Sequence, residues 1–287
     1  MSAPYRLMGV VNVTPDSFSD GGRYLRAEAA IEHGIRLAEE GAVILDVGGE
    51  STRPGAEPVG EAEELARVLP VVEGLDAAPV AVQISIDTAK AAVADAALRA
   101  GASLVNDVTA LRGDPRMAEV VAEHEAECCL MHMLGEPRTM QRDPRYGDVV
   151  AEVGAFLAER RDFAVSRGIA RERILLDPGI GFGKNEQHNL ELLRRIDELC
   201  GLGAPIVLGT SRKSFIGRIA ARAAGVEGPL AADERLAGTI ATNVLGYERG
   251  ASVFRVHDVA PLRDALAVAA ATLGERWTAR SPASPTS

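Results

Sequence analysis

The sequence has little of what marks a secreted, membrane-spanning or zinc-binding protein. Its 287 residues include three cysteines, Cys128, Cys129 and Cys200, which give no disulfide framework and no paired C-x-x-C zinc spacing. No uninterrupted apolar run is long enough to cross a bilayer, and a strand predicted from Leu7 leaves no room for a signal peptide. We therefore expect a reduced, cytosolic protein.

Aromatic residues and basic charge are also scarce. Aromatics make up 4% of a sequence that is 47% hydrophobic, so the core must consist mainly of Ala, Val, Leu and Ile, which suits buried parallel strands. The 31 basic residues are outnumbered by 41 acidic ones, for a net charge of -10. This negative charge argues against a protein that binds nucleic acid or membrane surfaces in general. It does not exclude a local basic site for an anionic substrate.

What the sequence does contain is a regular alternation of short apolar runs and helical segments. The apolar runs are predicted strands, at Leu7–Val11, Val43–Val47, Val80–Ile86, Leu104–Val105, Cys128–Met131, Ile174–Leu176, Ile206–Leu208 and Ser252–Val256. The predicted helices span about 27–40, 60–75, 90–100, 115–124, 149–167, 186–200, 215–224, 235–249 and 259–273.

Eight alternations without a break in composition predict a single α/β domain, a (β/α)8 barrel, over residues 1–275. An open, doubly wound sheet is the alternative. Residues 276–287, rich in Ser and Pro, are predicted to be a disordered tail.

The stretch from Ile174 to Lys184 is the strongest local signal. An apolar strand ends at Asp177, Pro178 prevents further strand pairing, and three alternating glycines follow. The glycine spacing matches neither the dinucleotide fingerprint nor the phosphate-binding P-loop. A carboxylate at the carboxyl end of a parallel strand lies where α/β enzymes build active sites, whereas the simpler interpretation is a turn with a solvated Asp.

Polar residues stand at the ends of most predicted strands, which would bring them to one mouth of a barrel. These residues are Asn12, Asp46, Asp87, Asn106, Asp177, Lys213, Arg255 and His257. For Asp107 and Asp258, capping of the next helix is an equally good interpretation. His132, between two methionines, and Cys128 and Cys129, in an apolar strand, are predicted core residues.

The strand-end residues divide into two chemical sets. Asp87, Asn106 and Asp177, together with Lys213, suit a flat heterocycle with alternating donors and acceptors, because a carboxylate accepts two parallel N–H bonds and Asn both donates and accepts. The second set suits a phosphate-type anion, since Arg offers paired planar donors. Its members are Asn12, Thr52, Arg53, Arg255 and His257.

Several motifs closely resemble the bacterial dihydropteroate synthases, from about Leu7 to Leu273. The matching segments are Met8–Gly22, Asp46–Gly55, Asp177–Gly179, Ser211–Ser214 and Arg255–Val259. The resemblance implies a homodimeric transferase of folate biosynthesis. It would condense 7,8-dihydropterin-6-ylmethyl diphosphate with 4-aminobenzoate, which gives 7,8-dihydropteroate and diphosphate.

The resemblance also implies roles for individual residues. The pterin would be held by Asp87, Asn106, Asp177 and Lys213, and the diphosphate by Thr52, Arg255 and His257. Asn12 would ligate Mg²⁺. The aminobenzoate would lie among Phe18, Pro54, Phe182, Ser211 and Ser214. Catalysis would involve Asp16, Asp20, Arg53 and Lys213, with Asp16–Gly22 and Gly48–Gly55 as mobile loops that close over the site.

The sequence shows no nucleophile–base pair, which fits an SN1-like reaction through a pterin-methyl cation. Ser211–Gly217 lacks the inserted Phe-Gly of sulfonamide-resistant relatives, so sulfonamides are expected to be competitive inhibitors. One alternative is a methyltetrahydrofolate-binding barrel of a corrinoid methyltransferase system, which would not need the residues that suit a phosphate-type anion. A second alternative is a non-catalytic paralogue, but the intact cationic residues argue against it.

Overall fold

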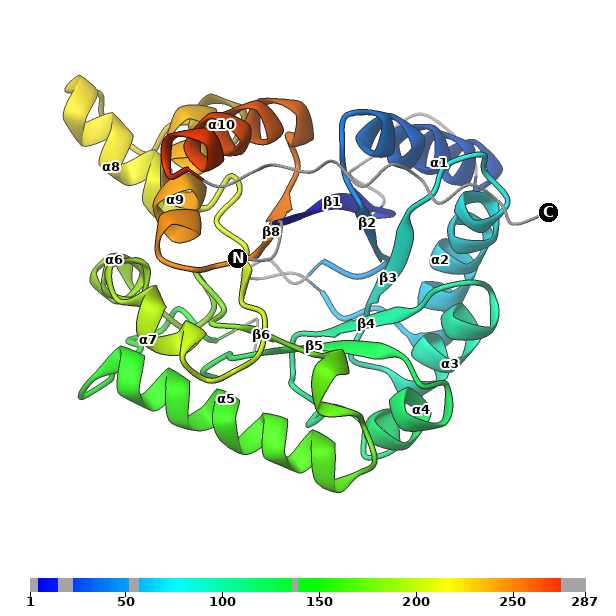
Figure 1. Cartoon of the computed structure of the whole chain (residues 1–287). Coiled ribbons are helices and arrows are strands. Elements are labelled where there is room, and N and C mark those ends of the chain that lie inside the picture. Colours follow the sequence, from blue (N-terminus) through cyan, green and yellow to red (C-terminus); the bar gives the residue numbers. More distant parts are fainter. Residues whose placement is uncertain (1–4, 15–22, 52–56, 136–138, 275–287) are drawn as a thin grey trace.

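Eight parallel strands surround a central axis, and helices cover them on the outside (Figure 1). The computed structural model describes residues 5–14, 23–51, 57–135 and 139–274, with the side chains of 23–26 left out of the description. The strands are β1 (Arg6–Asn12), β2 (Ile44–Gly48), β3 (Gln83–Asp87), β4 (Leu104–Asp107), β5 (Glu127–Met131), β6 (Ile174–Asp177), β7 (Val207–Leu208) and β8 (Val253–Val256).

The sheet order is β6-β5-β4-β3-β2-β1-β8-β7, and a parallel bridge from Leu176 to Ile206 joins its two ends. The ring is therefore nearly closed, as predicted, and the open doubly wound sheet is wrong. Because β7 has only two residues, this bridge is the sole ladder contact that the described residues form between β6 and the chain entering β7.

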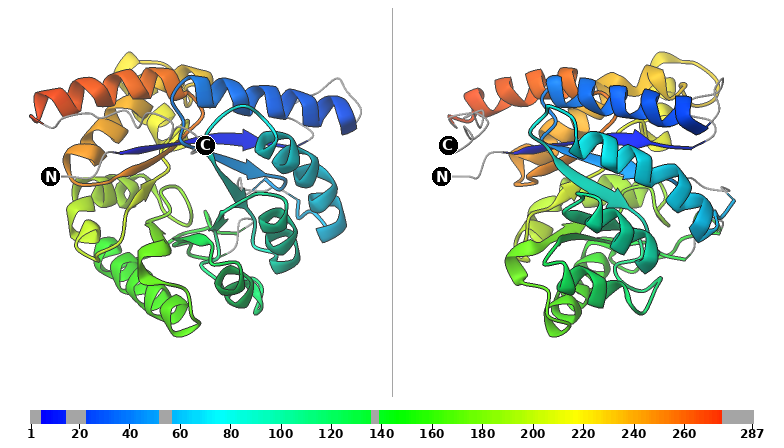
Figure 2. Two further views of the ribbon diagram at one scale, coloured as in Figure 1. Left: turned by 45° about the vertical axis from the view of Figure 1, so that its right-hand side comes forward. Right: turned by 90° about the vertical axis from the view of Figure 1, so that its right-hand side faces the viewer.

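Helices follow the strands and form the outer layer seen from two sides in Figure 2. They are α1 (Arg23–Glu39), α2 (Glu61–Asp76), α3 (Ala91–Arg99), α4 (Met117–Glu123), α5 (Val149–Ser166), α6 (Glu186–Arg194), α7 (Ile196–Cys200), α8 (Ser214–Ala224), α9 (Leu236–Glu248) and α10 (Val259–Thr272). Among the described residues, no helix is long and apolar enough to cross a membrane.

Two predicted elements differ from the structure. The single helix expected over 186–200 is interrupted at Arg195, which has a non-helical backbone and separates α6 from α7. The third strand begins at Gln83 rather than Val80, because Val80 follows the end of α2 in a short turn closed by its bond to Ala78 O. The tail at 276–287 lies outside the described residues.

The described residues form three hydrophobic clusters, of which the smallest, built of Val108, Met131, Met133 and Met140, packs against Phe182. Helix and strand side chains pack against each other around the barrel in one large cluster, which includes Cys128 as predicted. A smaller cluster fills the barrel interior and is built from single residues of seven strands: Met8, Ile44, Leu104, Cys129, Leu175, Val207 and Val253. Each of the seven is 1% exposed or less, so these residues form an apolar plug, hereafter the interior plug.

Candidate active site

A layer of polar side chains lies directly above the interior plug, at the carboxyl ends of the strands. In four strands a plug residue is followed two positions later by a polar one: Ile44 by Asp46, Leu104 by Asn106, Leu175 by Asp177, and Val253 by Arg255. Because side chains in a strand alternate between its two sides, these polar residues also point into the barrel, one step nearer its carboxyl end. The plug is thus the floor of a polar site.

Asp46 is the centre of this layer. Its side chain is completely buried. One carboxylate oxygen, Oδ2, accepts bonds from Arg255 Nε at 2.6 Å and from Asn106 Nδ2 at 3.0 Å, and the other accepts from Ser85 Oγ at 2.6 Å. The sequence predicts Asp46 at a strand end but indicates no role for it. The signal that could have found it is its position two residues after a plug residue, as for Asn106 and Asp177.

Arg255 extends the network to the next carboxylate. Its NH2 group donates to Asp87 Oδ2 at 2.8 Å, while its Nε is bound to Asp46. From the sequence, Arg255 is predicted only as a member of the anion-binding set, but its guanidinium lies between Asp46 and Asp87, and Asp87 belongs to the heterocycle-binding set. Arg255 therefore joins the two sets instead of belonging to one of them.

Burial gives these carboxyl groups unusual proton affinities. Burial, and then the neighbouring charge of Asp46, raise the pKa of Asp87 to about 7 even though Arg255 opposes the shift. Burial likewise raises the pKa of Asp177. Carboxyl groups with raised pKa values are held in a region where a partner carrying N–H donors would restore their charged form.

Asp177 ends β6 with only 6% of its surface exposed, so the solvated-turn interpretation is wrong. Its Oδ1 accepts a bond from Gly179 N at 2.6 Å, which ties the carboxylate to the glycine-rich loop. Gly179 itself has φ +66°, and a β-carbon there would collide with the carbonyl oxygen of His132. Only glycine fits this position, and the loop is consequently packed directly on the chain that follows β5.

Lys213 reaches the same site from the segment between β7 and α8. Its Nζ lies 4.1 Å from the ring centroid of Phe182, an arrangement typical of a cation–π contact. Nearby, Ser211 Oγ and His257 Nδ1 are 2.9 Å apart. The structure thus brings together Phe182 and Lys213, and separately Ser211 and His257, as pairs among the predicted binding residues.

Arg212, which lies between Ser211 and Lys213 in the chain, has a left-handed backbone with φ 58°. Its guanidinium pairs with both oxygens of Asp258, Nε with Oδ2 at 3.0 Å and NH2 with Oδ1 at 2.7 Å. Asp258 stands at the start of α10 but makes no capping bond with its side chain. Asp107 closes its own turn by accepting from Thr109 and Leu111. Capping of the next helix is therefore wrong for both residues.

The remaining predicted residues are less enclosed or lie outside the described ranges. Asn12 is half-buried at the end of β1, and Ser214 is exposed at the start of α8. The described residues contain no group of three or more His, Cys, Asp or Glu placed to hold a metal ion. Six predicted residues fall in the ranges that are not described: Asp16, Phe18, Asp20, Thr52, Arg53 and Pro54.

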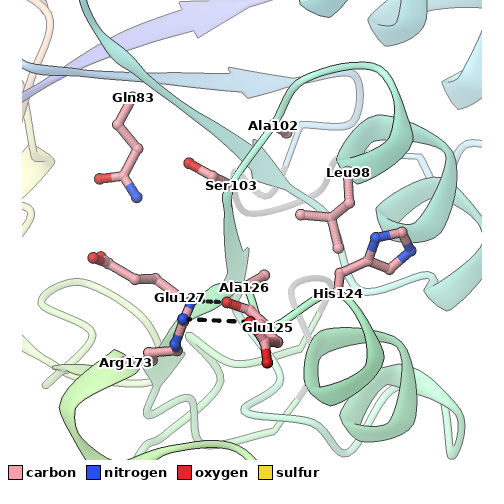
Figure 3. A pocket seen from close by; sticks show the side chains of 9 residues that line it. All are labelled: Gln83, Leu98, Ala102, Ser103, His124, Glu125, Ala126, Glu127 and Arg173. Carbon is pink, nitrogen blue, oxygen red and sulfur yellow. Dashed lines mark hydrogen bonds and ion pairs between the residues drawn. The ribbon is translucent and has the colours of Figure 1, made fainter. Parts of the chain in front are cut away.

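A cavity of about 390 Å³ lies at the other end of the barrel, where Gln83 begins β3 and Glu127 begins β5 (Figure 3). Its charged side chains are bound to local partners, Glu127 to Arg6 at 3.2 Å and Arg173 to Glu125. Polar groups at the amino-terminal end of a barrel are typical of stability rather than catalysis. We therefore place the candidate active site at the carboxyl-terminal end.

Comparison with known proteins shows which proteins this chain is similar to. A family model described as pterin binding enzyme matches residues 8–257. A dihydropteroate synthase of Mycobacterium leprae is 48% identical over 273 residues, which is 94% of this chain and 94% of that protein. Two solved structures are similar at TM-score 0.87. One is the Xanthomonas albilineans dihydropteroate synthase with 4-aminobenzoic acid, which is 48% identical, and the match covers 95% of this chain and 94% of that one. The other is the Yersinia pestis dihydropteroate synthase with a sulfonamide drug, which is 41% identical, and the match covers 94% of this chain and 95% of that one.

Proposed function

The chain belongs to the dihydropteroate synthases, a family of pterin-binding enzymes, and from this membership we propose how its residues carry out the reaction. The reaction is the transfer that the resemblance implied: 7,8-dihydropterin-6-ylmethyl diphosphate and 4-aminobenzoate form 7,8-dihydropteroate and diphosphate, a step of folate biosynthesis. The protein is accordingly a transferase.

The observation that carries the assignment of the pterin site is the polar layer above the interior plug. Asp87, Asn106 and Asp177 end three different strands, and the interior plug gives this end of the barrel an apolar floor. A pterin presents several N–H donors along one edge, and carboxylates that are buried and incompletely neutralised accept such donors strongly. A ligand without that edge would leave buried charge unpaired, so the layer would discriminate against it.

Asp46 would act behind the pterin. Because it binds Asn106, Ser85 and Arg255 at once, it fixes the amide of Asn106 and the guanidinium of Arg255 in single orientations. The remaining nitrogen of Arg255, NH1, would then point toward the reacting part of the substrate. The diphosphate would lie there, bound by Thr52, Arg255 and His257.

The chemistry needs no nucleophile from the chain. The bond between the pterin methylene carbon and the diphosphate oxygen would break first, and its electron pair would leave with the diphosphate. The arylamine nitrogen would then form the new bond to the methylene carbon and release a proton to solvent. Asp87 and Asp177 would offset the positive charge that develops on the ring, because both carboxylates are already in place.

Mg²⁺ would be held at Asn12, whose half-buried side chain offers a neutral amide oxygen at the mouth of the site. This fits Mg²⁺ because the ion commonly takes one or two protein ligands and fills its coordination with water and substrate phosphates. When bound, the ion would neutralise charge on the departing diphosphate.

The arylamine would lie against Phe182, Ser211 and Ser214, on the Lys213 side of the site. Phe18 and Pro54 would complete this pocket, and Asp16, Asp20 and Arg53 would contribute to catalysis from the loops that close over it. Closure would exclude water, which would otherwise capture the cation. Sulfonamides would compete for the same pocket.

We further propose a cytosolic homodimer. Two of the exposed large apolar side chains lie on the neighbouring helices α9 and α10, Leu245 with 47% and Val268 with 68% of its surface exposed. Such positions suit burial against a second copy. Sedimentation velocity tests this: a single species of twice the chain mass is expected, and a single monomeric species at micromolar concentration would contradict it.

The function is tested by mixing the purified protein with the pterin diphosphate, 4-aminobenzoate and Mg²⁺ and measuring diphosphate release. Release that depends on the arylamine is expected, with formation of 7,8-dihydropteroate in equal amount. Lys213→Ala should abolish it while leaving the circular dichroism spectrum unchanged. Diphosphate release that proceeds equally without arylamine would contradict the proposal.

A further inference from the structure

Lys184 is a buried lysine that the reaction described above does not use. It ends the glycine-rich loop after β6 and has 2% of its surface exposed. Its ammonium group lies 2.9 Å from His132 Nδ1, 3.0 Å from Phe182 O and 3.3 Å from His132 O. Burial lowers the pKa of Lys184 to about 7, although the charge of Asp177 opposes the shift. In its charged form the group carries three hydrogens, and these three acceptors satisfy all of them.

The partner, His132, directly follows β5. Burial, and then the charge of Lys184, lower the pKa of His132 to about 3. The ring is therefore neutral, with Nδ1 as acceptor and the proton on Nε2. Its position is fixed by packing against the rings of Phe156, at 4.9 Å between centroids, and Tyr146, at 6.1 Å. Lys184 thus connects the glycine-rich loop to an aromatic ring that is held in place by packing.

Further bonds hold the loop residues that precede Lys184. Tyr146 donates to Gly183 O at 2.9 Å, and Gly181 N donates to Asn189 Oδ1 at 2.7 Å. A β-carbon at Gly183, which has φ +62°, would collide with the carbonyl oxygen of Leu134. The loop backbone is therefore pressed onto the segment after β5, and its path leaves Phe182 directed toward Lys213.

Phe182 connects this arrangement to the site. Its carbonyl oxygen accepts from Lys184, while its ring faces Lys213 Nζ at 4.1 Å. The two lysines therefore hold Phe182 from opposite sides, one at the backbone and one at the ring. A shift of the Phe182 backbone would move the ring away from Lys213.

We propose that Lys184 is a positioning residue for the arylamine substrate, because its ammonium fixes the backbone of Phe182 and thereby sets the Phe182 ring against Lys213. This rests on the proposed function, in which Phe182 lines the 4-aminobenzoate pocket. Lys184 acts through Phe182 and does not touch substrate. Of the residues proposed to hold the pterin, Asp87 and Asn106 come from other strands, and Asp177 is held at the end of β6 by its own bond from Gly179 N. Pterin binding should therefore depend much less on Lys184 than arylamine binding does.

The test compares Lys184→Met, which keeps an unbranched side chain nearly as long as that of lysine but removes the nitrogen, with Arg161→Met. Arg161 is a matched control because it is also a largely buried cation that donates to a loop carbonyl, that of Leu202, away from the site. Lys184→Met should raise KM for 4-aminobenzoate about tenfold or more, as expected for a misplaced binding surface. Its Kd for the pterin diphosphate, measured by calorimetry without arylamine, should stay within about threefold of wild type.

Arg161→Met should leave both quantities unchanged. An unchanged KM for 4-aminobenzoate in Lys184→Met, or an equal rise in KM and in the pterin Kd, overturns the proposal. Loss of arylamine-dependent diphosphate release in the wild-type protein would instead overturn the proposed function, so the two failures are distinguishable.

A double-mutant cycle with Phe182→Leu separates positioning from general destabilisation. If Lys184 acts through Phe182, adding Lys184→Met to Phe182→Leu raises KM little further, whereas independent effects would multiply. If Lys184→Met does not fold, His132→Phe carries the same test, because it keeps an aromatic ring and removes the Nδ1 acceptor. It should raise the same KM in the same direction, and an unchanged KM in that folded variant overturns the proposal.

Discussion

The two ends of the barrel use charged residues in different ways. At the amino-terminal end, Arg6 pairs with Glu127 at the surface, with side chains 30% and 28% exposed. At the carboxyl-terminal end, Arg255 pairs with Asp46, which is completely buried, and also with Asp87. In the first pair one cation neutralises one carboxylate, whereas Arg255 is surrounded by carboxyl groups with raised pKa values, Asp87 and Asp177. A buried carboxyl group without enough partners is costly, and of these two described pairs only the one at the carboxyl-terminal end is surrounded by such groups. A ligand with N–H donors is therefore expected to bind at that end.

The largest effect should come from neutralising Asp177. Asp177→Asn keeps the shape of the side chain but removes the charge that accepts the pterin N–H groups. Two charge-assisted bonds at about 1.5–3 kcal/mol each correspond to a loss of about 10²-fold or more in kcat/KM. The measurement is steady-state diphosphate release.

Asp95→Asn is the matched control for this change, because Asp95 pairs with His124 and Arg99 away from the site. It should leave kcat/KM within about twofold of wild type. If both variants lost activity equally, the contrast between the site carboxylates and the others would be unfounded.

The next largest effect concerns stability and tests Asp46. Asp46→Asn leaves Arg255 without its closest carboxylate and breaks the network that orients Asn106 and Ser85. Removing one partner of a buried pair costs about 3 kcal/mol or more in the free energy of unfolding, which urea denaturation measures. The variant should also lower the pKa of Asp87, because the charge of Asp46 is one cause of its elevation. A loss below about 1 kcal/mol would mean that the buried network behaves like a surface pair.

Much of this comparison was predictable from the sequence. Eight alternations of strand and helix predicted the barrel, and the polar residues at the strand ends predicted that Asp87, Asn106 and Asp177 lie at one mouth of it. The role of Asp46 was not predicted, because its partners come from β3, β4 and β8 and only the strand register brings them together. Lys184 was missed for a similar reason. Its bond to His132 depends on a close approach of two loops. The glycines permit this approach, but their presence in the sequence does not predict it.

A moderate effect is expected from pH. The pKa of Asp87 is about 7 in the free protein, and the pterin N–H groups require its ionised form. Affinity for the pterin diphosphate should therefore rise about tenfold between pH 6 and pH 8 as Asp87 loses its proton. Calorimetry at pH 6 in two buffers of different ionisation enthalpy should also show proton release on binding.

Asp87→Asn provides the control, since it has no proton to lose and should flatten the pH dependence while weakening binding throughout. Stability should change in the opposite sense. The folded-state pKa exceeds the unfolded value of 3.8, so the folded protein binds more protons between these values, and this group lowers the free energy of unfolding as pH rises from 4 to 7. An unaltered pH dependence of binding in Asp87→Asn would assign the titration to another group.

The smallest effect is expected at the amino-terminal end. Glu127→Gln removes the charge that pairs with Arg6 but leaves a side chain able to accept its bond. Because both partners are about a third exposed, water replaces most of the lost interaction, and the free energy of unfolding should fall by no more than about 1 kcal/mol. Raising the salt concentration should shrink the difference further, since exposed pairs are screened and the buried Arg255–Asp46 pair is not. A loss in Glu127→Gln as large as that in Asp46→Asn would show that the two ends do not differ in the way their charges are held.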